Sequence, residues 1–173
     1  MRNHPFLFAL LAGAVSFPSL AQQGPSDPQI AHIVVTANQV DIDAGHLAEK
    51  RGSTDEVRKF GTQMVTDHTA VNKQATELVQ KLNVTPQANE TSAGLKEGGQ
   101  QNIAKLEKLS GKQFDKAYVD QEVAYHQAVI DAVDKTLLPS AKNEQLKALI
   151  RKVRPALVQH RDHAKHLQSQ LAR

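Results

Sequence analysis

The chain has 173 residues, a formal net charge of +3 and no cysteine. The lack of cysteine excludes disulfides, thiol chemistry and thiolate metal ligands, so packing alone must hold the fold. Basic and acidic residues alternate along the chain without the one-sided basic stripe of nucleic-acid-binding proteins, and we expect no nucleic-acid partner.

The chain begins with the pattern of a secretory signal peptide. Arg2 is followed by an apolar run over residues 6–17 and by the small-residue exit Ser19-Leu20-Ala21. This order predicts cleavage near Ala21 and export to the periplasm or the medium. Because a spanning helix needs about 20 apolar residues, the run is too short to cross a bilayer, and a retained anchor is the alternative. We expect no transmembrane segment in the mature chain.

The predicted domain organisation is simple. The signal peptide covers residues 1–21, a polar leader that we expect to be disordered covers 22–26, and a single helical domain covers 27–173. The length left after cleavage matches the roughly 150 residues of one domain. We therefore expect a single core.

Apolar residues at three- and four-residue intervals predict five helical segments. The first begins at an Asp27 cap followed by Pro28 and ends at Gly52 as a left-handed cap. The second begins with Ser53 and Glu56, the spacing of a reciprocal cap, and extends through residue 82.

The other three helical segments follow an exposed connection. The third, over residues 93–109, is the short and weak one because it contains several glycines. The fourth covers residues 114–137 and is stopped by Pro139. The fifth starts after an Asn143 cap and runs to the C-terminus. No segment alternates as a strand does, so the predicted fold class is an all-α helical bundle.

Polar side chains interrupt the apolar stripes at matched positions. His68, His126 and His160 each lie one turn from apolar residues on a different helix, and Asp41 does so on the first. Glu122 lies one turn before His126 on the same face. These imidazoles and carboxylates are donors that a divalent transition metal such as iron, copper or zinc accepts. They can equally form a buried hydrogen-bond network, and both interpretations stay open.

His163 is a secondary ligand candidate. It follows His160 by three residues, so we expect it at the edge of the apolar face or on the surface. A histidine at such an edge would bind a metal ion from solution without belonging to a dedicated site.

Several strings resemble one bacterial family. They are Gly45-His46-Leu47-Ala48, Met64-Val65-Thr66-Asp67-His68-Thr69, Leu109-Ser110-Gly111, Phe114-Asp115-Lys116-Ala117-Tyr118, His126, and Arg154-Pro155-Ala156-Leu157 with His160. Together they resemble the exported, ferritin-like family named domain of unknown function 4142 over nearly all of the mature chain. The resemblance implies a ferritin-like four-helix bundle in the bacterial envelope and supplies no activity. It matches His68, His126 and His160, with Asp41 where the family usually has Glu.

The sequence departs from the ligand pattern of di-iron enzymes. Such enzymes carry two Glu-x-x-His motifs. Here Val65, Val123 and Leu157 stand three residues before the inward histidines. No Gly-x-Ser-x-Gly elbow of a hydrolase is present either. The sequence therefore favours a non-enzymatic envelope protein that binds a transition metal, and the alternative is a structural or interaction module with a buried His/Asp network.

Overall fold

The computed structural model describes residues 24–173, so the predicted signal peptide and the start of the leader lie outside the described residues. Residues 24–26 adopt no regular secondary structure. The described residues form helices and contain no strand, which confirms the all-α class. Within this part of the chain, no helix has the length and apolar character that crossing a membrane requires.

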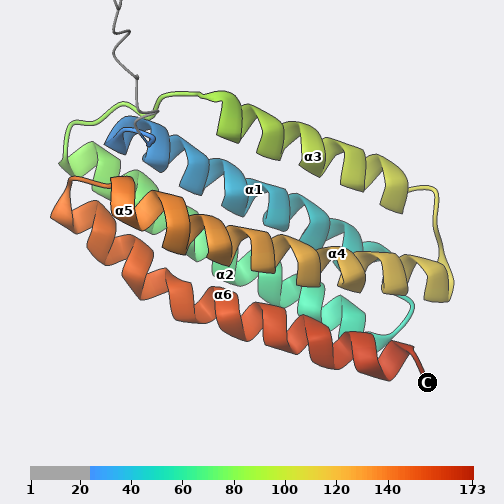
Figure 1. Cartoon of the computed structure of the whole chain (residues 1–173). Helices are drawn as coiled ribbons and strands as arrows, with labels where there is room; N and C mark the ends of the chain where they lie inside the picture. Colours follow the sequence, from blue (N-terminus) through green and yellow to red (C-terminus); the bar gives the residue numbers. More distant parts are fainter. Residues whose placement is uncertain (1–23) are drawn as a thin grey trace, which may run out of the picture.

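Four long helices lie side by side (Figure 1): α1 (Asp27–Arg51), α2 (Asp55–Lys81), α4 (Gly111–Ala132) and α6 (Glu144–Leu171). Helix α1 packs against α2 and α4, and α6 packs against the same two helices, so the four enclose a common core. The shorter α3 (Glu90–Leu106) lies outside them against α1 and α4. The site described below lies inside this four-helix core.

The chain after α4 differs from the sequence prediction. Helix α4 passes into a π-helical segment, Val133–Leu137, and then into the short α5 (Leu138–Ser140). Pro139 therefore does not stop the helix before it, because the helical backbone continues through it to Ser140. The start of α4 also lies earlier than predicted, at Gly111, whose positive φ of 56° suits glycine.

Helix α3 also differs from its predicted bounds. It begins at Glu90 because the Asn89 side chain accepts a hydrogen bond from the Ser92 N–H at 3.1 Å and caps the first turn. The helix ends at Leu106, and Ser110 caps α4 instead of closing α3. The glycines of α3 therefore do not shorten its start.

Two predicted caps are wrong because their residues contact distant segments. Ser26 is the N-cap of α1, while the Asp27 carboxylate accepts from the N–H groups of Lys142 and Asn143 ahead of α6, at 2.8 and 2.9 Å. Ser53 likewise bonds to the buried Asp115 of α4, and the next residue, a threonine, caps α2. Carboxylates thus tie a turn at each end of the molecule to a neighbouring helix.

The remaining boundary predictions have mixed outcomes. Gly52 follows α1 with a φ of −53°, so it is not the left-handed cap that the sequence suggested. Asn143 does cap α6, since its side chain accepts from the N–H groups of Gln145 and Leu146 at 2.9 and 3.1 Å. Pro155 lies within the continuous helix α6.

The core consists of two apolar clusters with polar residues between them. One cluster includes Phe60, Met64, Phe114 and Tyr118, and the other includes residues from the opposite halves of α1, α4 and α6. Asp115 follows Phe114 of the first cluster directly, and the other buried polar residues of the long helices lie between the two clusters or border one of them. These other residues form one layer across the middle of the core.

Two glycines set the distance between α1 and α2. A Cβ added at Gly61 would lie 2.8 Å from the Gly45 carbonyl oxygen, and one added at Gly45 would lie 2.9 Å from the Gly61 carbonyl oxygen. These oxygens belong to helical backbone, which cannot yield as a flexible side chain does. The close approach of the two helices therefore requires glycine on both sides.

We expect Gly61→Ala to lower the free energy of unfolding by about 1–3 kcal/mol, because the added methyl group forces α1 and α2 apart. Urea denaturation monitored by circular dichroism measures this change. The matched control is Gly98→Ala in α3, where nothing lies within 4 Å of the added Cβ. That control is expected to stabilise the protein by up to about 1 kcal/mol through helix propensity. Equal effects of the two substitutions would contradict the packing argument.

Candidate metal centre

The polar layer brings together five titratable side chains from all four long helices. They are Asp41 from α1, His68 from α2, Glu122 and His126 from α4, and His160 from α6, and none is more than 3% exposed. Each follows the periodicity of its own helix, which turns it toward the core as it turns the apolar residues on either side. The four ligand candidates of the sequence and the secondary candidate Glu122 thus lie in one place.

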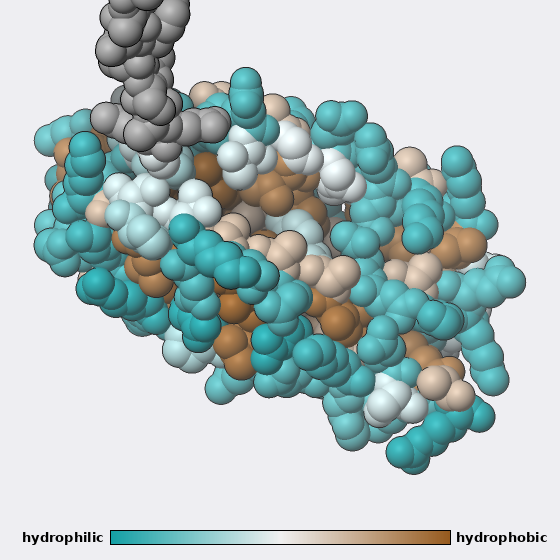
Figure 2. All heavy atoms as spheres, in the orientation of Figure 1, coloured by the Kyte–Doolittle hydropathy of each residue, from teal (hydrophilic) through white to brown (hydrophobic). Residues whose placement is uncertain are grey.

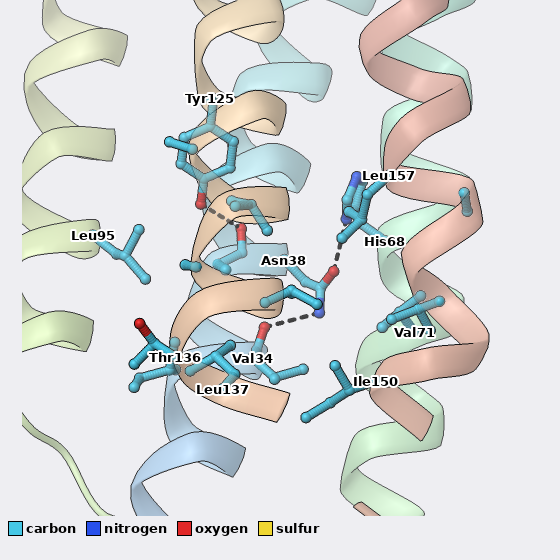
Figure 3. A pocket seen from close by; sticks show the side chains of 18 of the residues that line it. Val34, Asn38, His68, Val71, Leu95, Tyr125, Thr136, Leu137, Ile150 and Leu157 are labelled. Atoms are coloured by element: carbon cyan, nitrogen blue, oxygen red, sulfur yellow. Dashed lines mark hydrogen bonds between the residues drawn. The ribbon is translucent and has the colours of Figure 1, made fainter. Parts of the chain in front are cut away.

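The ring of His68 is oriented by a side-chain amide. Its Nδ1 lies 2.7 Å from Oδ1 of Asn38, and Asn38 in turn donates through Nδ2 to the Val34 carbonyl at 2.8 Å (Figure 3). Because the amide nitrogen is committed to that carbonyl, the amide oxygen faces the ring and can only accept. Nδ1 of His68 therefore carries the proton, and Nε2 carries a free lone pair.

The other two rings are oriented in the same manner. Nδ1 of His126 donates to the backbone carbonyl of Glu122 at 3.0 Å, and Nε2 of His160 donates to a carboxylate oxygen of Asp67 at 2.9 Å. Both partners are acceptors only, so the protons again point outward. The lone pairs remain on Nε2 of His126 and Nδ1 of His160.

These three lone-pair nitrogens are buried without a partner. His68 Nε2, His126 Nε2 and His160 Nδ1 make no hydrogen bond within residues 24–173. The three rings pack together with centroid separations of 5.2 to 5.6 Å, and one ligand atom from each lies within 4.8 Å of the others. An unsatisfied buried acceptor costs about 1–3 kcal/mol, so three in one place need an explanation.

Two carboxyl groups border the imidazoles. Asp41, Glu122 and His126 also offer ligand atoms within 4.8 Å of one another, so His126 belongs to both groups. Oδ2 of Asp41 lies 3.5 Å from Nε2 of His68, and Oε2 of Glu122 has no hydrogen-bond partner in the described chain. The carboxyl groups therefore lie close enough to the imidazoles for both to bind the same metal ion.

Burial makes the charged form of every group in the layer unfavourable. Burial, together with a smaller contribution from neighbouring imidazoles, lowers the pKa of His68 to about 2 and that of His126 to about 4. Burial also lowers the pKa of His160, against the opposing effect of Asp67. In the same way, burial raises the pKa of Glu122 to about 8. Burial also raises the pKa of Asp41, and the negative charge of Glu122 raises it too. Near neutral pH the layer is thus largely uncharged.

The secondary candidate His163 lies outside this cluster. It is exposed, its Nδ1 lies 3.1 Å from Gln63 Oε1, and its ring contacts Phe60 edge-on. The sequence reasoning missed Asn38 and Asp67, which fix the rings. Asn38 carried a usable signal, because it precedes Asp41 by three residues and so shares its face of α1.

We expect the metal-free protein to respond to pH through Glu122. Its carboxyl has a pKa of about 8 in the folded state and of about 4.5 when unfolded. The contribution of the protonated carboxyl to stability is therefore complete below pH 4.5 and is lost as the pH rises to 8. The Glu122→Gln variant keeps the shape and cannot ionise. Its melting temperature should therefore rise relative to wild type between pH 5 and 8, because wild type loses at most about 1.4 kcal/mol of unfolding free energy per pH unit.

Differential scanning fluorimetry in chelator-treated buffer measures this difference. The exposed Glu56→Gln serves as the control, and its offset from wild type should not change over the same range. His68 and His126 titrate in the opposite sense, since their lowered pKa values cost stability as pH falls below about 6.5, and they are present in both proteins. A constant offset for Glu122→Gln would show that Glu122 is not held protonated.

Comparison with known proteins gives a family match over most of the chain. Neither a curated protein nor a solved structure matches the chain. The profile of one protein family, described as Domain of unknown function (DUF4142), matches residues 13–167. This span includes all five buried titratable residues of the centre and confirms the membership that the sequence strings indicated. The chain belongs to the DUF4142 family.

Proposed function

We propose that this protein binds one divalent first-row transition-metal ion between His68, His126 and His160. The observation that supports this is the shared orientation of the three rings. Each directs its N–H to a fixed oxygen acceptor and leaves its other nitrogen buried and unpartnered. Histidines that ligate metals have this outer hydrogen bond as a rule, because it sets the tautomer and the ring angle.

The carboxylates suit the same ion. A tetrahedral ion with bonds of about 2.0–2.1 Å holds its ligand atoms about 3.4 Å apart. Asp41 Oδ2 and His68 Nε2 are 3.5 Å apart, so the shorter Asp side chain does not keep this residue from the site. Asp41 and Glu122, once ionised, also balance the two positive charges of the ion. Binding therefore displaces protons from these carboxyls.

Imidazole nitrogens with carboxylate oxygen suit zinc, copper or iron. The absence of Glu-x-x-His at these histidines favours a single ion over a di-iron pair. The mutual packing of the four long helices, with ligands projecting inward from each, supports the further proposal of a ferritin-like four-helix bundle. We propose a binding role and no catalytic step.

The second candidate function is a structural or interaction module of the cell envelope. The outer hydrogen bonds of His68 to Asn38 and of His160 to Asp67 favour it, because they join α2 to α1 and α6 to α2 whether or not an ion binds. In this case the inner nitrogens have no role, and His126→Leu should leave the melting temperature unchanged or raise it. The protein should then also contain no stoichiometric metal.

We also propose that the protein is exported after cleavage near Ala21. The support is the order of basic, apolar and small residues at the start of the chain. Mass spectrometry of the protein from a periplasmic fraction should give a mature N-terminus at Gln22. A full-length chain retained with the membranes would favour an anchor instead.

The metal proposal is tested on untagged protein by isothermal titration with Zn²⁺ and by the visible spectrum of the Co²⁺ form. Wild type should bind one ion per chain. Single His68→Ala, His126→Ala and His160→Ala substitutions should each weaken binding at least about 10-fold, because each removes a ligand that the buried site cannot replace. The melting temperature of each variant is recorded to show that it is folded.

The matched control is the triple substitution of the exposed histidines His46, His163 and His166, which removes the same number of imidazoles from the surface. It should retain the affinity and the stoichiometry of wild type. Loss of binding in this control, with binding retained in the three core variants, would falsify the proposed site.

A further inference from the structure

An apolar pocket adjoins the imidazole cluster. It has a volume of about 320 Å³, and its wall is formed almost entirely by aliphatic side chains such as Val34, Val71 and Leu157 (Figure 3). Its lining residues extend from Ile150 to His160 along α6, a rise of about 15 Å at 1.5 Å per residue. The pocket is therefore elongated along the helix axes.

The pocket can be reached from the surface. Its lining includes three exposed residues: Thr91 of α3, Ala128 of α4 and Thr136 of the π-helical segment. Apolar residues do reach the surface among the hydrophilic ones (Figure 2). The volume is about twice that of the ~150 Å³ apolar cavity that takes up benzene, so a ligand of roughly ten non-hydrogen atoms fits.

One end of the pocket is polar. His68 and His160 line the pocket and also belong to the imidazole cluster, and each has a buried nitrogen without a partner. Their outer nitrogens are already bonded, as is the Tyr125 hydroxyl, which donates to the Ala37 carbonyl at 3.0 Å. The free nitrogens are enclosed within the imidazole cluster, so a ligand in the pocket does not reach them.

The charges around the pocket exclude an anionic ligand. Among the described residues its lining contains no lysine or arginine, and it contains the carboxylate of Asp67. An anionic head group would have no counter-charge there, and burying an unpaired charge is costly. A neutral molecule avoids this cost.

We propose that the pocket binds a neutral, elongated apolar molecule. The alkyl body fills the aliphatic part of the pocket. The proposal concerns the metal-free protein and stands apart from the metal proposal, so the failure of one does not decide the other.

The test is isothermal titration of chelator-treated protein with octan-1-ol. We expect saturable binding of one molecule per chain. The anion octanoate, which has a chain of the same length, should bind at least 5-fold more weakly. Absence of saturable octan-1-ol binding overturns the proposal, and equal binding of octanoate does so too, because the proposed ligand is neutral.

The location is tested by filling the pocket. Val153→Phe places a larger side chain in the lining and should weaken octan-1-ol binding at least 10-fold. The control is Val158→Phe, a half-buried valine on the same helix that is not among the lining residues, and it should bind as wild type does. Both variants are checked for folding by their melting curves and for Zn²⁺ stoichiometry, which should not change. Wild-type affinity in a folded Val153→Phe protein would place the ligand elsewhere and overturn the proposal.

Discussion

The fold depends on burying ionisable groups without burying charge. Five titratable side chains occupy the middle of a core that contains no cysteine, and all five are almost inaccessible to solvent. Burial shifts each toward its neutral form, so imidazoles and carboxyls coexist there without strong repulsion. The apolar clusters on either side keep water out and maintain these shifts. A dication changes this balance, because it favours the ionised carboxylates that burial disfavours.

Helical periodicity predicted the polar layer because it depends on local spacing alone. A histidine four residues after Met64 must lie on the buried face of α2, whatever the neighbouring helix is, and the same holds for His126 and His160. The resemblance of the sequence strings to DUF4142 gave the family, which the family profile confirms. Spacing also placed Glu122 near His126 before the pKa of either group was known.

What the sequence could not predict depends on contacts between distant segments. Asp27 has the local signature of a cap for α1, yet its carboxylate binds backbone more than one hundred residues away. Ser53 does not cap α2 for the same reason, since its hydroxyl donates a hydrogen bond to Asp115 of α4. The partner of each imidazole, and hence the nitrogen left free, depends on ring rotation that no spacing encodes. The pocket beside the cluster is likewise formed by several helices together.

The π-helical segment after α4 has a consequence for the shape of that pocket. In an α-helix, residues four apart drift around the axis by about 40° per step, because a turn takes 3.6 residues. The wider turn of the π-helix, with its i→i+5 hydrogen bonds, reverses this drift. Pocket-lining residues spaced by four thus continue from Ala128 through Ala132 to Thr136, and from Val129 through Val133 to Leu137. This wall therefore runs straight for about two turns where a regular helix would have twisted it away from a long ligand.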